Sequence, residues 1–165
     1  MTNEDRQGRR MRRRTVLAAA VSALGLVGIA DARSYYDGDL VDMAVIDRDT
    51  GQEAQVYRHD GRLFVAGRPG ARYGVRVTNN TGGRVLVVMS VDGVNVLTGE
   101  TADYAQRGYV FDPYESYVVT GWRKSDSEVA AFNFTRLSRS YAARTGRPGD
   151  VGVIGVAAFR ERAIP

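Results

Sequence analysis

The chain of 165 residues contains no cysteine, one histidine (His59), one lysine (Lys124) and one tryptophan (Trp122). Without cysteine there is no disulfide framework, thiolate metal site, lipoprotein anchor or cysteine nucleophile. A zinc site would need carboxylates for nearly all of its ligands. A serine triad would have to use His59, which stands beside a predicted turn, and the sequence has no G-x-S-x-G elbow. The sequence therefore singles out no catalytic residue, no metal site and no cofactor.

The N-terminus has the three parts of an export signal in their usual order. Six arginines come first, and residues 15–30 then form an uncharged apolar run of 16 residues. Ala30-Asp31-Ala32 follows as an A-x-A cleavage site. A membrane span needs about 20 apolar residues, and this run is shorter and interrupted by Gly25 and Gly28. We expect residues 1–32 to be a helical signal peptide that touches the membrane only before cleavage, which predicts a periplasmic or secreted protein.

The basic character of the chain lies in this leader. Of 23 basic and 19 acidic residues, residues 1–32 hold six and three, which leaves 17 and 16 in the remainder. A nucleic-acid-binding domain should carry a basic patch of its own. A mature part with a formal charge of +1 and well-mixed signs predicts no nucleic-acid partner.

From Arg33 onward the hydrophobic pattern mostly has a period of two, which is typical of half-buried strands. Turn residues interrupt it every 8–12 residues. Tyr73, Val75 and Val77 should share one face, and Asp92-Gly93 between two β-branched runs predicts a type I′ hairpin. The predicted strands cover residues 40–46, 54–58, 63–66, 73–79, 85–91, 94–97, 117–122, 129–135 and 151–159.

This spacing predicts an all-β fold, an antiparallel β-sandwich of about seven to nine short strands. Residues 33–39 are expected to be a flexible leader, and residues 40–165 a single domain. Only residues 138–144 offer a helical turn. A domain of this size buries about two-thirds of its unfolded surface, so it can fold without disulfides.

The best candidate for a binding surface is the aromatic stretch at residues 98–124. Aromatic faces beside polar groups bind both sugar rings and partner proteins. The simpler interpretation assigns Tyr117 and Trp122 to the core and lets the other tyrosines cover the sheet edge. The candidate ligand-binding residues are Tyr104, Tyr109, Tyr114, Trp122, Arg123, Lys124, Arg144 and Arg147, the four basic ones forming a hypothetical anion or carbohydrate site.

Two other patterns suggest chemistry. Asp47-Arg48-Asp49-Thr50-Gly51 alternates acids before a glycine, as calcium loops do, but its glycine is fifth and Arg58 stands where an EF-hand has glutamate; a hairpin turn is the simpler interpretation. Paired carboxylates about 5 Å or about 6.5–9.5 Å apart would suit a glycosidase. The candidates are Glu100, Asp103, Asp112, Glu115, Asp126 and Glu128.

Several segments carry a resemblance: residues 90–96, 98–102, 121–125, 140–148 and 151–159. In order and spacing they are similar to a group of small exported bacterial proteins of uncharacterised function, over roughly residues 70–160. The resemblance implies one coherent domain over that span, with residues 33–70 more variable. It assigns no role to any residue.

Three functions are left open. The leading one is a non-catalytic binding or structural domain of the cell envelope, with an unknown protein or glycan as partner. The second is a carboxylate-based glycan-processing enzyme that uses two of the acids above. The third is a self-assembling envelope component whose strands associate through exposed edges.

Overall fold

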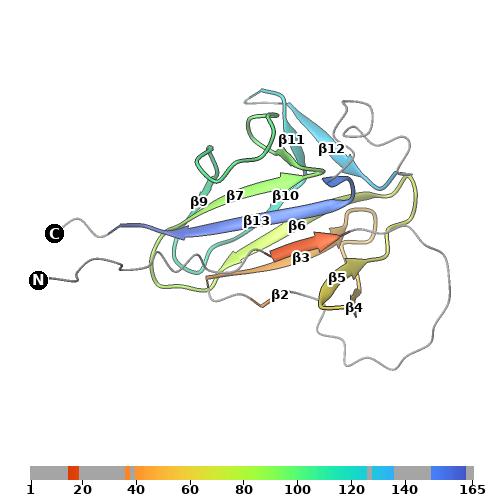
Figure 1. Cartoon of the computed structure of the whole chain (residues 1–165), viewed down its shortest axis with the longest axis horizontal. Coiled ribbons are helices and arrows are strands. Elements are labelled where there is room, and N and C mark those ends of the chain that lie inside the picture. The colour runs from red at the N-terminus through yellow and green to blue at the C-terminus, as the bar shows by residue number, and fades with distance from the viewer. Residues whose placement is uncertain (1–14, 19–35, 38–39, 126–127, 136–149, 163–165) are drawn as a thin grey trace, which may run out of the picture.

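The computed structural model describes residues 15–18, 36–37, 40–125, 128–135 and 150–162. These residues form thirteen strands in two mostly antiparallel sheets, so the predicted all-β class is confirmed (Figure 1). Within them no helix is long and apolar enough to cross a membrane. The predicted helical turn at residues 138–144 lies outside the described residues.

The first sheet has seven strands in the order β4-β5-β1-β13-β7-β8, with β9 also paired to β7. The longest pair runs antiparallel between β7 and β13, from Val85 opposite Arg160 to Val91 opposite Ile154. The strands are β1 (Thr15–Ala18), β4 (Val56–His59), β5 (Arg62–Val65), β7 (Val85–Val91), β8 (Val94–Asn95), β9 (Tyr109–Phe111) and β13 (Val153–Arg160).

The second sheet has six strands in the order β11-β12-β6-β3-β2, with β10 also paired to β6. Its longest pair joins β3 and β6, antiparallel from Val41 opposite Asn79 to Asp47 opposite Tyr73. The strands are β2 (Tyr36–Asp37), β3 (Val41–Asp47), β6 (Arg72–Asn79), β10 (Ser116–Val119), β11 (Gly121–Arg123) and β12 (Val129–Asn133).

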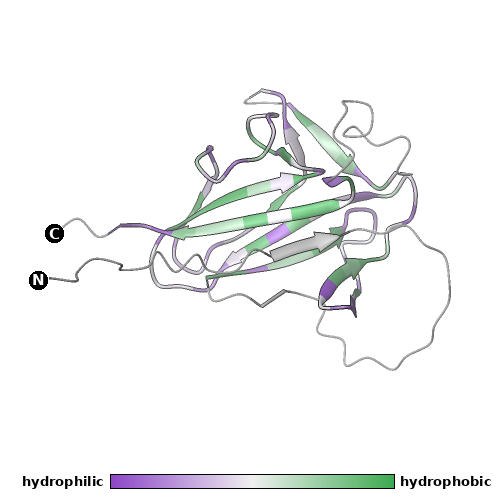
Figure 2. Ribbon diagram, in the orientation of Figure 1, coloured by the Kyte–Doolittle hydropathy of each residue, from purple (hydrophilic) through white to green (hydrophobic). Residues whose placement is uncertain are grey.

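One hydrophobic cluster takes side chains from both sheets. Alternate residues point into it, because side chains on a strand alternate between its two faces. Val75 and Val77 of β6 are fully buried there with Tyr73, as the pattern predicts. Figure 2 shows the apolar colouring concentrated on the central strands β7 and β13. Other members are Val41, Met43, Val45, Leu63, Val65, Val85, Val87, Met89, Val91, Phe111, Phe132 and Ile154.

Two Asp-Gly pairs make the tight hairpins. Asp92 and Gly93 have φ of 55° and 71°, the signature of the predicted type I′ turn between β7 and β8. Asp60 and Gly61 have φ of 47° and 71° and join β4 to β5 in the same way. The strand after Asp92-Gly93 is shorter than the predicted residues 94–97. It ends at Asn95, a buried residue, and the chain leaves β7 there.

Asp92 yields a pH-dependent prediction. Burial raises the pKa of its carboxyl, although the Gly152 amide donates to its Oδ1 atom at 2.7 Å. A raised native pKa means that the stabilisation is complete when the group is protonated and is lost as pH rises through the native pKa. Asp92→Asn keeps an Oδ1 atom that can accept from the Gly152 amide, and asparagine suits this turn. It also removes the buried charge, so we expect a higher melting temperature at pH 7. Near pH 3 Asp92 is itself protonated, and we expect no such gain.

Thermal unfolding at the two pH values measures this difference. The matched control is Asp60→Asn, which makes the same change in the same turn type at an exposed carboxylate. It also removes the exposed pair between Asp60 and His59 at 3.3 Å, but exposed pairs contribute little, so it reports mainly the preference of the turn. A gain for Asp92→Asn that is equal at pH 3 and pH 7 would contradict the assignment to a buried charge.

The structure divides one predicted strand, residues 117–122, into β10 and β11. One edge of β6 is shared by β10, which pairs with residues 75–78, and β12, which pairs with Tyr73 and Arg72. The chain must therefore leave this edge where β12 begins, and β11 pairs with the far edge of β12. Gly121 permits the crossing, because a Cβ there would lie 2.1 Å from the carbonyl oxygen of Ala130.

Besides β9, two short strands near the N-terminus lie where the sequence predicts none. β2 pairs with β3 inside residues 33–39, the segment expected to be a flexible leader. β1 occupies residues 15–18 of the predicted signal peptide, so the structure has a strand at four positions where a helix was expected. Short apolar runs suit either element, and a pairing partner decides between them.

Candidate functional site

The part of the aromatic stretch that the structure brings together is carried by β9 and β10. β9 pairs with β7 in the first sheet, and β10 pairs with β6 in the second. The tight connection between them therefore crosses from one sheet to the other. It is closed by the Glu115 amide, which donates to the Asp112 carbonyl at 3.1 Å, and by the Asp112 amide, which donates to Oε2 of Glu115 at 2.8 Å.

Tyr109 and Tyr117 meet across this crossing. Their ring centroids lie 6.1 Å apart with the planes tilted by 40°. Arg123 of β11 is the third member, because its side chain lies close enough to Tyr109 to act on the pKa of the phenol. Burial raises the pKa of Tyr109, and the charge and hydrogen bond of Arg123 oppose part of that increase. We call Tyr109, Tyr117 and Arg123 the tyrosine–arginine patch.

The patch is accessible. Tyr117 is 51% exposed, Tyr109 is half-buried and Arg123 is exposed. The backbone amide of Arg123 donates to the Val96 carbonyl at 2.8 Å, which anchors the strand that carries the guanidinium. Aromatic faces beside a planar cation can stack on a sugar or peptide plane and bind a carboxylate through two hydrogen bonds.

Trp122 lies against the core rather than with the patch. Its ring meets that of buried Phe132 edge-on, at 4.7 Å and 84°. This agrees with the simpler sequence interpretation for Trp122. For Tyr117 that interpretation was wrong, since its ring is half exposed at the end of β10. Tyr117 is two residues before buried Val119 and therefore lies on the same face of β10, the face toward the core. The sequence could not show that the core ends before Tyr117.

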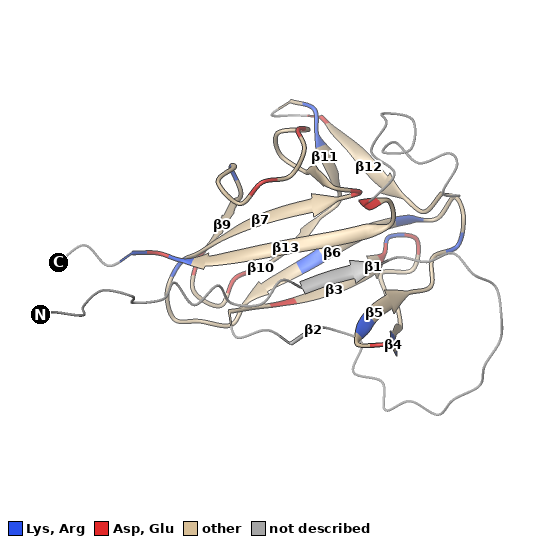
Figure 3. Cartoon of the chain, viewed as in Figure 1, with Lys and Arg blue, Asp and Glu red and all other residues tan. Residues whose placement is uncertain are grey.

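The other predicted ligand-binding residues are spread over the described surface. Tyr104 is 49% exposed in the loop before β9, and Tyr114 is 71% exposed, with its hydroxyl near Gly82. Lys124 pairs with Glu128 at 2.9 Å. Arg144 and Arg147 lie outside the described residues, so the hypothetical four-residue basic site stays a prediction. Figure 3 shows acidic and basic residues mainly at strand ends and loops.

Three of the candidate carboxylates accept hydrogen bonds that hold their own loops together. Glu100 accepts from Nε2 of Gln106 at 3.2 Å, and Asp103 from the Ala105 amide at 2.8 Å. The carboxylate of Glu115 closes the β9–β10 connection described above. Asp126 lies outside the described residues. The bonds of Asp103 and Glu115 explain why acids stand at loop positions, because a carboxylate satisfies backbone amides that a turn leaves unpaired.

The acidic turn after β3 is held in the same way. Oδ1 of Asp47 accepts the amides of Asp49 at 2.8 Å and Thr50 at 3.1 Å, and these bonds, with Arg68 beside the carboxylate, lower the pKa of Asp47. Arg72 pairs with Asp49 at 3.0 Å. The hairpin-turn interpretation is thus the one the structure matches. Among the described residues no group of three or more His, Cys, Asp or Glu side chains could hold a metal ion.

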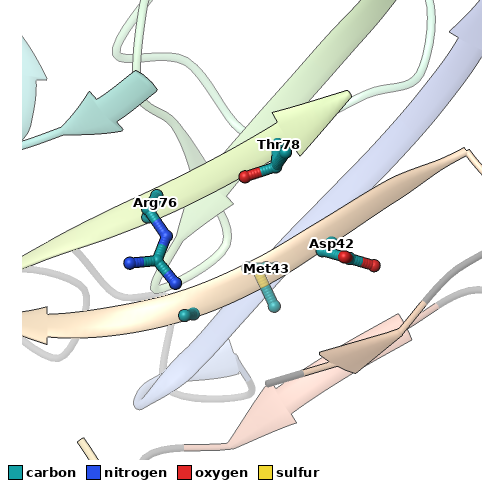
Figure 4. A pocket seen from close by; sticks show the side chains of 5 residues that line it. Asp42, Met43, Arg76 and Thr78 are labelled. Carbon is teal, nitrogen blue, oxygen red and sulfur yellow. The ribbon is translucent and has the colours of Figure 1, made fainter. Parts of the chain in front are cut away.

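A shallow pocket of about 50 Å³ lies on the outer side of β3 and β6 (Figure 4). Oδ1 of Asp42 is buried near it without a hydrogen-bond partner among the described residues. Small-molecule sites usually have volumes of about 300–1,000 Å³. This pocket suits a water molecule bound to Asp42 better than a sugar ring. Its lining residues are Asp42, Met43, Ala44, Arg76 and Thr78.

The sequence did not single out Asn79 and Asn95, the two buried asparagines of the described residues. Asn95 holds the loop before β9: its Nδ2 donates to Gln106 and to the Arg107 carbonyl, both at 3.1 Å, and its Oδ1 accepts the amides of Leu97 and Thr98. It thereby supports the position from which Tyr109 enters β9. An asparagine inside an apolar run was the only sequence signal, since buried polar groups need partners.

The geometry defines a class, an all-β protein of two mostly antiparallel sheets with a small tyrosine–arginine patch at one crossing between them. No family model, curated protein or solved structure matches the chain.

Proposed function

We propose that the chain is the precursor of an exported cell-envelope protein with a non-catalytic binding or structural role. Its two sheets around one cluster form a β-sandwich, and residues 1–32 direct export. The observation that carries the binding role is the tyrosine–arginine patch, where two aromatic rings from different sheets and a guanidinium are presented together. A protein segment or a glycan with a carboxylate is the partner that such a surface favours.

A binding experiment tests the patch. The full chain is immobilised and offered soluble peptidoglycan fragments, acidic cell-wall polysaccharide and envelope protein extract, and the affinity for each retained partner is measured. We expect Tyr117→Ala and Arg123→Ala each to weaken binding at least about tenfold, which corresponds to about 1.4 kcal/mol. The loss of a stacked ring or of a paired guanidinium is of that size.

Tyr57→Ala is the matched control, because Tyr57 is a similarly exposed tyrosine on β4 with its own partner, Gln55. It should leave binding unchanged. Equal losses for Tyr57 and Tyr117 would remove the patch from the proposal. Hydrolysis of a glycan that disappears on Glu100→Gln or Glu115→Gln would defeat the non-catalytic role.

Export is tested separately. We expect the protein in the periplasmic or secreted fraction, with an N-terminus near Arg33. Recovery of the intact chain from the cytoplasm alone would refute export and leave the patch to be judged by its own experiment.

A further inference from the structure

β1 holds a position that cleavage of the leader would vacate. It lies between β13 and β5, antiparallel to the first and parallel to the second. Leu17 is opposite both Ile154 and Leu63, and Ala18 is opposite Val153 and Phe64. If residues 1–32 are removed, β5 and β13 face each other across a slot one strand wide, each with an unpaired edge.

The edge of β13 has none of the usual protection against strand pairing. Natural edge strands carry charges, prolines or bulges, or are very short. β13 is eight residues long, without proline, and its only charge is Arg160 at the end. In Figure 3 the strand is uncharged over nearly its whole length. Such an edge is expected to be covered in the working protein.

We propose that the slot between β5 and β13 is a strand-acceptor site, which in the mature protein takes an extended apolar segment of a partner protein. This inference rests on the proposed export and cleavage. Backbone groups of both strands supply hydrogen bonds, and alternate side chains supply specificity. The position opposite Ile154 and Leu63 must be apolar, because those side chains are 1% and 5% exposed in the core.

A second copy of the chain is a poorer donor. Its described strands beyond residue 32 all pair within the two sheets. The segment that follows the leader, residues 33–39, is mostly polar, and the last five residues contain Glu161, Arg162 and Pro165. A partner with a Thr-Val-Leu-Ala-like extended segment therefore fits the slot better.

The first experiment tests the slot in the full chain by disulfide formation, which is unambiguous because the protein has no cysteine. Ala18→Cys with Val153→Cys joins directly opposed positions, whose Cα atoms should lie about 4.5–5.5 Å apart, within reach of a disulfide. The control pairs Ala18→Cys with Ala157→Cys, which lies four residues, or about 13 Å, farther along β13 than Val153. We expect rapid, intramolecular oxidation of the first pair only; equal oxidation of both, or of neither, overturns the inference.

The second experiment tests exchange. A protease site is placed between residues 30 and 33 of the full chain, and a fluorescent peptide of residues 12–20 is added before and after cleavage. We expect binding only after cleavage, because a tethered strand competes at high effective concentration. A peptide with Leu17→Asp should bind at least about tenfold more weakly.

Binding of both peptides alike would overturn the site. The cleaved chain could instead form dimers that the peptide does not dissociate. That result would assign the slot to a second copy and overturn the proposal of a partner protein. These outcomes can be distinguished from a failure of the proposed function. Disulfide formation reports the slot even if cells never cleave the leader, and patch variants report partner binding even if the slot is wrong.

Discussion

Replacement of Asn79 by alanine is expected to lower the free energy of unfolding by about 3 kcal/mol, which is a large part of the usual 5–15 kcal/mol. The side chain is 1% exposed at the end of β6. Its Nδ2 donates to the carbonyls of Gly83 and Asp112, each at 2.8 Å, and more distantly to that of Phe111. The chain crosses between sheets at both places, so one amide holds two crossings together.

Alanine would remove these bonds and those that Oδ1 accepts from Thr81, and each such bond contributes about 0.5–1.5 kcal/mol. The Asp112 carbonyl would keep the Glu115 amide as a donor, and the Gly83 carbonyl would keep the Thr81 hydroxyl. Chemical denaturation measures the loss. Asn79→Asp separates the donor from the acceptor function: it keeps Oδ1, which accepts from the Thr81 amide at 2.9 Å, but sets a carboxylate against carbonyl oxygens. We expect it to be at least as destabilising at pH 7 and to recover partly on acidification.

Asn133→Ala is the control for the loss of an asparagine amide. Its Nδ2 also donates to a carbonyl, that of Ala131 at 3.0 Å, but the residue is exposed. Water can replace that bond, so the change should stay within about 0.5 kcal/mol. Similar losses at residues 79 and 133 would show that Asn79 does not hold the crossings.

Phe132→Ala is expected to cost about 3–5 kcal/mol, the range for removal of a buried phenylalanine ring. Phe132 is fully buried in β12 and its ring stacks on Tyr73 at 5.3 Å. The same ring supports Trp122 edge-on. Its removal leaves a cavity between β6 and β12 that a closely packed core cannot fill.

Fluorescence measures this effect locally, because Trp122 is the only tryptophan. We expect the emission of the folded variant to shift to longer wavelength, together with a lower denaturation midpoint. Phe132→Leu should restore part of the stability, since it refills most of the volume. Phe159→Ala is the control at a partly exposed ring far along β13, and it should alter neither the spectrum nor the stability strongly. An unchanged spectrum in Phe132→Ala would contradict the contact.

The local elements were largely predictable because their causes are local. Alternation placed Tyr73, Val75 and Val77 in the core, and Asp92-Gly93 formed the predicted turn, because few residues tolerate positive φ at both turn positions. β9, only three residues long, was missed, since its pattern is too short to be distinguished from a loop. The division at Gly121 was missed because it depends on β12 occupying the edge of β6.

The candidate site was predictable only as a stretch of sequence. The aromatic loop directed attention to Tyr109 and Arg123, which the structure brings together, but also to Trp122, whose partly buried ring packs against Phe132. Tyr117 was assigned to the core, because alternation along the strand shows which face a residue is on but does not show where the core ends. Which tyrosine meets which arginine depends on strands paired in different sheets.

By itself the sequence determined the all-β class, the turn positions, the near neutrality of the chain beyond residue 32 and the lack of cysteine chemistry. Each follows from composition or from neighbours along the chain. Only the tertiary structure decided which strands pair, which asparagines are buried and where β1 lies. Those features depend on contacts between distant residues, which periodicity cannot encode. Residues 15–18, which the sequence predicts to be part of an export signal, therefore form a strand between β5 and β13.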